Sequence, residues 1–344
     1  MAAQAGTAPT DRIALWDNAR LVLIVLVVFG HLLESLRDDT AIKTVYRVLY
    51  SFHVPAFILV SGWFARSEPL DARALRGPLR LVVAWLAAEA GWALWRGLRG
   101  HRPFPEEFPV TQSWTLWFLV ALAAMRILLP YVAQLRFPLA VAVVGALAAG
   151  LSSSIGLEYS ASRILALLPF FVLGWWLRRA GLERAAWFRS PRRRVRAGAA
   201  GAAALTVLAV LALTRMPRFT DQLLFWRRSY EGEGYGDARG AVLRLAFLAI
   251  GAVLTLALLI LLPRGSHWFS ALGRNTLPVY LLHPPAVVAL RRAHLDDAIA
   301  ALPGAMGILL GLAVLATLVL ASPPVAFLMR PVTHPDLVFR PLRS

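Results

Sequence analysis

The stretch Leu15–His31, LWDNARLVLIVLVVFGH, decides the fold class of this chain. It carries Arg20 near its start, has no charged residue over Leu21–Gly30, and ends on a histidine. An α-helix rises about 1.5 Å per residue, so a bilayer core of about 30 Å takes about 20 residues to cross. The stretch therefore predicts a membrane-spanning helix with an ionisable side chain, His31, near or just beyond mid-membrane.

Apolar stretches of this kind recur along all 344 residues. Hydrophobic residues make up 58% of the chain and charged residues 16%, whereas soluble domains hold about 45–50% and about 25%. No soluble domain is therefore expected. We predict an all-α fold, a polytopic transmembrane helical bundle of about ten spans, at residues 13–36, 46–66, 79–97, 114–130, 137–155, 162–178, 197–214, 241–262, 275–291 and 303–328.

The spans define one membrane domain, residues 13–330, between a polar N-terminal tail (1–12) and a C-terminal tail (331–344). Arginines concentrate in the short connections, as they do in cytoplasmic loops of membrane proteins. This pattern predicts that both termini are cytoplasmic, in a multi-pass protein of the bacterial cytoplasmic membrane. The net charge of +17 then reflects topology, and nucleic acid is not expected as a partner. Loop 215–240 places five arginines outside, and its GEGYG stretch predicts an ordered or mobile surface loop.

Ionisable groups at membrane depth are functional hypotheses by default, and His31 is the sharpest of them. It lies eleven residues beyond Arg20, which is about 16 Å along a helix and close to three turns. Both side chains therefore project from nearly the same face. This placement suits a ligand that enters from the cytoplasm with its anionic end outermost, beside Arg20. Glu34 follows on that face and is expected to orient the ring. The alternative is that His31 only bonds a neighbouring helix.

His53 and His283 are predicted to reach a similar depth, next to Pro55 and Pro284, where kinks could open space. Three histidines could also be metal ligands. However, no H-x-x-H or H-E-x-x-H spacing occurs and the chain has no cysteine, so no metal site, thiolate chemistry or disulfide is expected.

Other polar and aromatic residues in the apolar stretches have structural interpretations. Glu89 and Arg126 are expected to pair with each other across neighbouring helices. Tryptophans near the predicted span ends are expected to be interfacial anchors rather than a platform for a sugar; they are Trp92, Trp95, Trp114, Trp117, Trp175 and Trp176.

Several motifs, taken in order, resemble the acyltransferase-3 family of bacterial integral membrane O-acyltransferases, in particular its branch similar to fucose 4-O-acetylases. The opening stretch resembles the family's first-span signature, a basic residue and a histidine separated by ten positions, here Arg20 and His31. The other matching motifs are FHVPAFILVSGWF (Phe52–Phe64), RALR (Arg73–Arg76), WFLVAL (Trp117–Leu122) and LGRNTLPVYLLH (Leu272–His283). Loop 215–240 matches none of the family's motifs.

The resemblance implies transfer of an acyl group, usually acetyl from acetyl-CoA, to a hydroxyl of a carbohydrate or glycosylated acceptor. Acetyl-CoA would be a donor substrate, with no permanently bound cofactor. His31 would be the general base or a transient acyl acceptor, with Glu34 beside it. Arg20, Arg73 and Arg76 would bind the CoA phosphates, and the acceptor would contact His53, Asn275 and His283. The competing hypotheses are a proton-coupled transporter or flippase, which intramembrane histidines also suit, and a scaffold protein.

Overall fold

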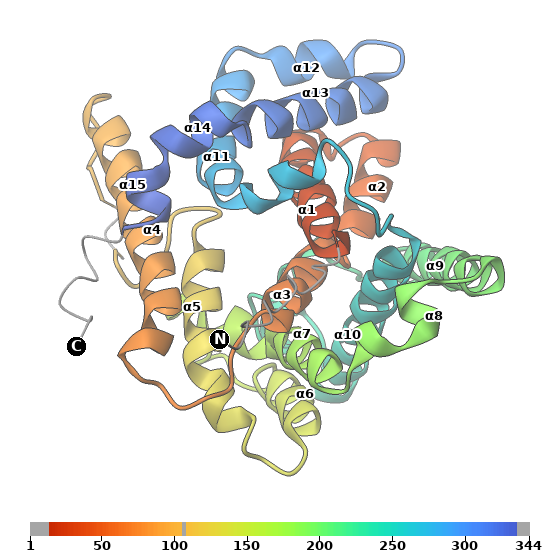
Figure 1. Ribbon diagram of the computed structural model, residues 1–344. Coiled ribbons are helices and arrows are strands. Elements are labelled where there is room, and N and C mark those ends of the chain that lie inside the picture. Colours follow the sequence, from red (N-terminus) through yellow and green to blue (C-terminus); the bar gives the residue numbers. More distant parts are fainter. Residues whose placement is uncertain (1–13, 105–107, 336–344) are drawn as a thin grey trace.

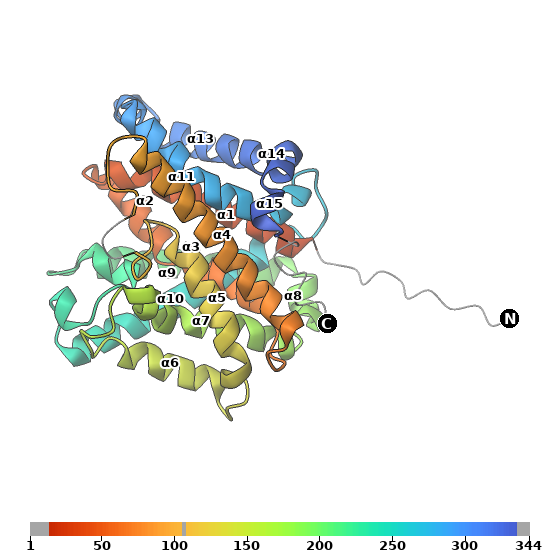
Figure 2. The ribbon, with the colours of Figure 1, turned by 90° about the vertical axis from the view of Figure 1, so that its left-hand side faces the viewer.

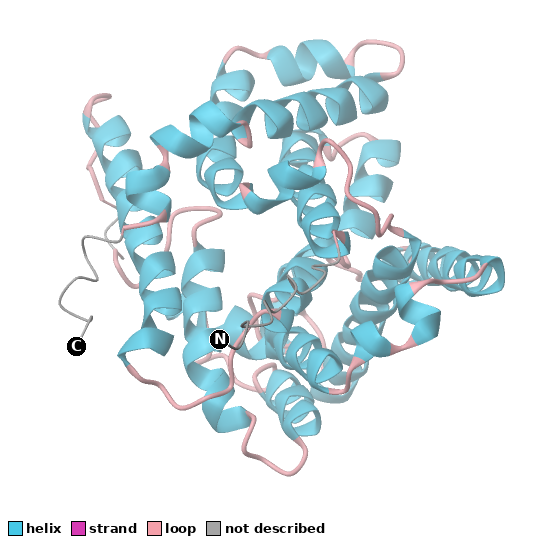
Figure 3. Ribbon diagram, in the orientation of Figure 1, coloured by secondary structure: helices cyan, strands magenta, loops and turns pink. Residues whose placement is uncertain are grey.

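The computed structural model describes residues 14–104 and 108–335, and within these ranges the chain forms helices, turns and loops with no strand (Figures 1 and 3). The described α-helices are α1 (Leu15–Leu33), α2 (Thr40–Tyr50), α3 (His53–Trp63), α4 (Ala72–Gly97), α5 (Trp117–Val132), α6 (Pro138–Ala148), α7 (Ala161–Arg179), α8 (Ala186–Arg189), α9 (Arg193–Thr214), α10 (Asp237–Leu261), α11 (Thr276–Arg292), α12 (Leu295–Ala300), α13 (Ala305–Leu320), α14 (Pro323–Leu328) and α15 (Arg330–Thr333).

Helices that could cross a membrane account for much of the bundle. Five helical segments in the described ranges are long and apolar enough, namely Leu15–Leu36, Thr40–Trp63, Glu158–Arg179, Arg193–Thr214 and Asp237–Leu261. Three shorter helices, α5, α6 and α13, are also apolar. The all-helical fold and a multi-pass membrane protein are thereby confirmed, while the total of ten spans and the cytoplasmic termini stay predictions.

The second predicted span, 46–66, differs from the structure in its start and its continuity. Helix α2 already begins at Thr40, where the Asp39 carboxylate caps it by accepting a 2.8 Å hydrogen bond from the Ile42 amide. The helix then breaks at Phe52, whose φ of −143° is not helical. Pro55 explains the break, since it has no N–H to donate to a carbonyl one turn earlier.

The third predicted span, 79–97, begins earlier than expected. Helix α4 starts at Ala72, with the Asp71 carboxylate accepting from the Ala74 amide at 2.6 Å. The RALR motif, Arg73–Arg76, therefore lies on the first turns of a helix, which fixes the spacing of its two guanidinium groups.

Two glycines bring α3 and α7 together in one of the most extensive helix contacts of the bundle. A Cβ on Gly62 would overlap the Phe171 carbonyl, and one on Gly174 would overlap the Leu59 carbonyl. Only glycine allows the two backbones to approach so closely, as at many helix contacts in membranes. The contact fixes the relative position of His53, at the start of α3, and the residues of α7.

Large apolar side chains are exposed on the helices at the edges of the bundle. Figure 2 shows α13 and α6 at opposite edges, and each exposes such side chains, Leu315 on one and Val144 on the other. Leu205 on α9 is 70% exposed. Such surfaces are unfavourable in water and suit a lipid environment.

The predicted terminal tails are described only in part. The N-terminal tail, 1–12, lies outside the described residues, as do residues 336–344. The beginning of the predicted C-terminal tail is helical, because Arg330–Thr333 form α15, which packs against α4.

Candidate active site

His31 lies in the last turn of α1, next to a carboxylate and an arginine. Its Nδ1 is 3.4 Å from Glu34 Oε2, and Arg291 Nη2 is 3.4 Å from the same oxygen. Arg291 also donates to the His31 carbonyl at 2.6 Å, which ties α11 to the end of α1. When Nδ1–H is directed at Glu34, the lone pair of the neutral imidazole is on Nε2. The arrangement provides an oriented base in a half-buried site.

Two more rings surround the imidazole of His31. Trp114 meets it edge to face, with ring centroids 5.0 Å apart, and His283 lies 5.3 Å away. The Nδ1 of His283 donates to the Val279 carbonyl at 3.1 Å, which leaves Nε2 as an acceptor. That Nε2 is buried and has no hydrogen-bond partner among the described residues.

His53 lies on the far side of the same space. Its Nδ1 donates to the Leu49 carbonyl at 2.7 Å and its ring packs against Tyr50. The side chain is almost fully buried. The structure thus brings three predicted site residues, His31, His53 and His283, into one region; their roles stay predictions.

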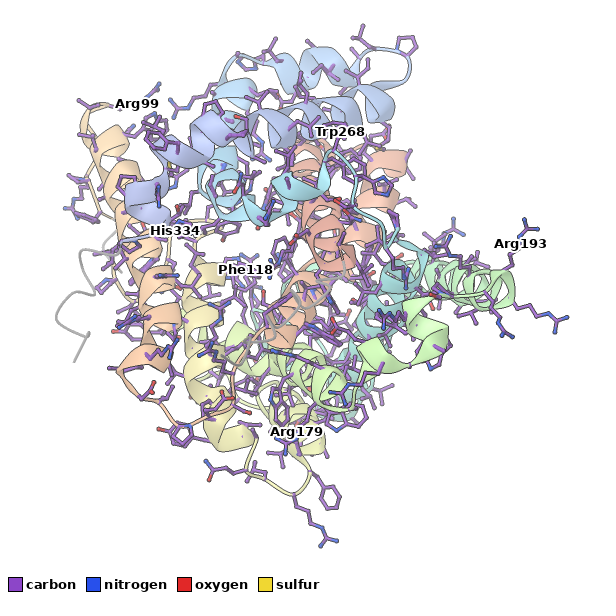
Figure 4. All side chains as sticks on the ribbon, in the orientation of Figure 1. Arg99, Phe118, Arg179, Arg193, Trp268 and His334 are labelled. Carbon is purple, nitrogen blue, oxygen red and sulfur yellow. The ribbon has the colours of Figure 1, made fainter. Side chains whose placement is uncertain are left out.

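A cavity of about 280 Å³, which we call the histidine cavity, opens beside His31 and His53. It continues into a smaller space of about 40 Å³, the inner chamber, which also reaches Tyr280 and Phe118. In Figure 4, Phe118 lies near the middle of the molecule. The remaining lining residues of the histidine cavity are Glu34, Tyr50, Val54, Thr111, Gln112, Trp114, Thr115, Trp117, Leu157, Arg163, Leu224, Phe225, Trp226 and Arg227.

Part of the lining of the histidine cavity contradicts the sequence-based interpretation. Trp114 and Trp117, which we expected to anchor the chain at the membrane surface, line the histidine cavity instead. Loop 215–240 lies against the bundle, and its Trp226 and Arg227 line one side of the cavity. Ser162 Oγ holds this loop by donating to the Trp226 carbonyl at 2.6 Å. Sequence spacing gave no signal for these residues, because they come from distant segments.

A second cavity, of about 360 Å³, lies near the other end of α1 and is lined by arginines, so we call it the basic cavity. Arg73 and Arg76 of the RALR motif both line it. Its other ionisable lining residues are Arg66, Arg80, Arg126 and Glu68. The Arg20 guanidinium stacks 4.2 Å from the centroid of the Phe64 ring, which also lines this cavity. The three predicted donor-binding arginines are thereby collected at one place.

The expected pairing of Glu89 with Arg126 is wrong. Glu89 accepts hydrogen bonds from the Ser113 amide at 2.8 Å and the Ser113 hydroxyl at 2.6 Å, and so fixes the segment before Trp114. Arg126 instead lies beside Gly77, at the opposite end of α4. These two positions on α4 are about 18 Å apart along the helix axis, too far for a contact.

Asn275 is the one predicted acceptor-binding residue that the structure places apart from His31. Its side-chain amide donates to the Ala321 carbonyl at 2.9 Å and so links the start of α11 to the end of α13. It lines neither the histidine cavity nor the inner chamber. Across the described ranges no group of three His, Cys, Asp or Glu side chains is arranged to hold a metal ion.

Comparison with known proteins identifies the family. Residues 13–323 match the family described as an acyltransferase domain. The match covers most of the chain, which therefore belongs to the acyltransferase-3 family. The resemblance to this family is confirmed, while the branch similar to fucose 4-O-acetylases stays a prediction. The searches of curated proteins and of solved structures gave no match. The family and the apolar helices together make this protein a multi-pass membrane acyltransferase.

Proposed function

We propose that this protein transfers an acyl group, in the first instance acetyl, from acyl-CoA to a hydroxyl of a carbohydrate or glycosylated acceptor. The protein would lie in the bacterial cytoplasmic membrane with both termini in the cytoplasm. One observation carries the proposal: the His31–Glu34 pair faces a cavity that can hold an acceptor, while a cluster of arginines lies near the other end of the same helix.

The basic cavity fits the phosphate end of CoA. Arginine binds phosphate through two parallel hydrogen bonds, and five arginines line this cavity beside one carboxylate, that of Glu68. Arg20 lies about 16 Å from His31 along α1. The long pantetheine arm of CoA spans a separation of this order, so the phosphates can bind at the arginines while the thioester reaches His31.

The reaction follows from the position of His31. Its Nε2 takes the proton from the acceptor hydroxyl as the oxygen attacks the thioester carbonyl. A new C–O bond forms, the C–S bond breaks, and the imidazolium returns its proton to the departing CoA sulfur. Glu34 stabilises the imidazolium between these steps, and Arg291 holds Glu34 in place.

Thr115 is the best candidate to stabilise the oxyanion that forms on the thioester carbonyl. It lines both the histidine cavity and the inner chamber. Its Oγ1 is buried and has no hydrogen-bond partner among the described residues, while Tyr280 donates to its backbone carbonyl. A fixed hydroxyl in a site with little water is an effective donor to developing negative charge.

The histidine cavity suits a sugar acceptor. Its aromatic lining residues, among them Trp114, Trp117, Phe225 and Trp226, have flat faces that can pack against the C–H face of a sugar ring. Its volume of about 280 Å³ is close to the lower end, about 300 Å³, of small-molecule pockets. We therefore expect one sugar unit to be bound here, on the outer side of the proposed topology.

Labelled acyl transfer tests this function. Purified protein in liposomes is incubated with radiolabelled acetyl-CoA and with membrane and soluble extracts of a strain that lacks the gene. We expect a labelled product and release of free CoA, both dependent on His31. Uptake of an unmodified solute into the liposomes, with no labelled product, would instead support the transporter hypothesis.

A further inference from the structure

The histidine cavity contains two guanidinium groups that the proposed chemistry does not use. Arg163 lies in the first turn of α7, and Arg227 lies in loop 215–240. Both line the cavity that contains His31, and they are close enough for their charges to repel each other. Two like charges on one small cavity are unfavourable unless something compensates them.

The protein contacts of these two arginines leave their charges uncompensated. The Arg163 guanidinium lies 4.3 Å from the Trp117 ring centroid, and its Nε donates to the Phe225 carbonyl at 3.4 Å, the outer limit of a hydrogen bond. Arg227 lies over the Phe225 ring and donates to the Gln222 side-chain oxygen at 2.8 Å. These partners are neutral, so each contact orients the guanidinium but does not neutralise it.

The nearby carboxylates are engaged elsewhere or form no ion pair with these groups. Glu34 is paired with His31 and Arg291, and Asp221 is paired with Arg47 at 2.7 Å. Glu233 lies within electrostatic range of Arg227, but burial raises the pKa of Glu233 to about 7. Among the described residues, no carboxylate forms an ion pair with Arg163 or Arg227.

We propose that the acceptor carries an oxyanion, a carboxylate or a phosphate, which binds to Arg163 and Arg227 while its hydroxyl lies at His31. This inference rests on the proposed function and adds the charge of the substrate to it. Phe225 contacts both guanidinium groups and so fixes them relative to each other. An oxyanion with two or three oxygens can accept hydrogen bonds from both arginines at once.

The proposed anion site is distinct from the proposed donor site in the basic cavity. The arginines at the start of α4 lie on the other side of the histidines, where the CoA phosphates would bind. Arg163 and Arg227 lie on the side closed by loop 215–240. Burial, followed by the neighbouring Arg228, lowers the pKa of Arg227, which agrees with a guanidinium held partly out of water before a ligand arrives.

The charge of the labelled product that the protein forms from cell extracts tests this inference. Membrane and soluble extracts of the strain that lacks the gene are labelled with purified protein and radiolabelled acetyl-CoA, and the protein-dependent product is passed over an anion-exchange column at pH 7. We expect the product to be retained. A labelled product in the flow-through would overturn the inference and leave the acyltransferase function standing, whereas the absence of any protein-dependent product would overturn the proposed function and this inference with it.

The source of the negative charge is then identified on the retained product. Loss of retention after phosphatase treatment or mild acid identifies a phosphate, and loss after amidation with a carbodiimide identifies a carboxylate. Retention that survives both treatments would come from another anion, such as a sulfate, and would overturn the inference as stated.

Substitution of Arg163 and Arg227 tests whether these two arginines bind the anionic group of the acceptor. Arg163→Gln and Arg227→Gln should each raise the KM for the isolated acceptor at least about tenfold, the effect of losing one charge-assisted hydrogen bond, and leave the KM for acetyl-CoA unchanged. Arg215→Gln, at an exposed position just after α9, is the matched control and should alter neither KM. An unchanged acceptor KM in both cavity variants would overturn the assignment of these residues.

Discussion

The histidine cavity and the basic cavity lie near opposite ends of α1 and are built from different side chains. The first is walled by aromatic rings and lined by His31 and His53, whereas the second is walled by arginines with little aromatic surface. Aromatic walls with a few directed polar groups suit a sugar ring and a chemical step. Clustered guanidinium groups suit the binding of phosphates. Under the proposed function, catalysis and donor binding are separate along one helix, and this separation can be tested one cavity at a time.

Removal of the imidazole should have the largest effect. His31→Ala is expected to lower the rate of labelled acetyl transfer by about 10²- to 10⁴-fold, the usual contribution of a general base. His294→Ala is the control, because the His294 side chain is 83% exposed and lies outside both cavities. Near-normal transfer by a His31→Ala protein that elutes from a size-exclusion column as a folded species would show that the reaction does not take place at the histidine cavity.

Loss of the Thr115 hydroxyl should come next. Thr115→Val keeps the shape of the side chain and removes its donor, so kcat is expected to fall by about 10²-fold, the effect of losing one oxyanion donor. Thr115→Ser keeps the hydroxyl and should retain most of the activity. If both variants lose activity equally, the side chain acts through packing rather than as a donor.

Changes in the basic cavity should act on the donor alone. Arg73→Gln and Arg76→Gln are each expected to raise the KM for acetyl-CoA by about 10-fold, since each removes charge-assisted hydrogen bonds to phosphate. Steady-state kinetics should show the acceptor KM unchanged. Arg193→Gln is the control, since Arg193 projects outward from the start of α9 (Figure 4). A rise in acceptor KM would show that the two cavities do not have separate ligands.

The smallest effect concerns the stability of loop 215–240. Burial raises the pKa of Glu233 from 4.5 to about 7, so the folded protein favours its protonated form. This contribution to the free energy of unfolding is complete below about pH 4.5 and is lost as the pH rises through about 7, a change of at most about 3 kcal/mol. Thermal unfolding should therefore show a Tm that falls over this range, and Glu233→Gln should lose that slope. The exposed Glu231→Gln should keep it, and a slope that persists in Glu233→Gln would come from other groups.

The sequence predicted the helical class, the approximate position of most helices and the contact of Glu34 with His31 on one helix face. These are local properties, because hydrophobic length and helical spacing are written into consecutive residues. The parts that it missed depend on contacts between distant segments. The pairing of Glu89 with the Ser113 segment, rather than with Arg126, is one such contact.

The aromatic and cationic wall of the histidine cavity is another such case. Tryptophan near the end of a span has the same sequence signature whether it faces lipid headgroups or a cavity, so Trp114 and Trp117 could not be assigned from their positions. Arg163 and Arg227 are 64 residues apart and lie close together where the Ser162 hydroxyl donates a hydrogen bond to the Trp226 carbonyl. The proximity of these two arginines has no signature in the periodicity of a single sequence.

The glycines at the contact of α3 and α7 limit how the protein can open to its ligands. With Gly62 and Gly174 holding the two backbones together, these helices cannot slide or tilt past each other without a steric clash. They form a rigid frame that carries His53 on one helix and Arg163 on the other. We therefore expect movement that admits a substrate in the elements around this frame, and substitution of the side chains on its walls should alter substrate preference without a change in the frame itself.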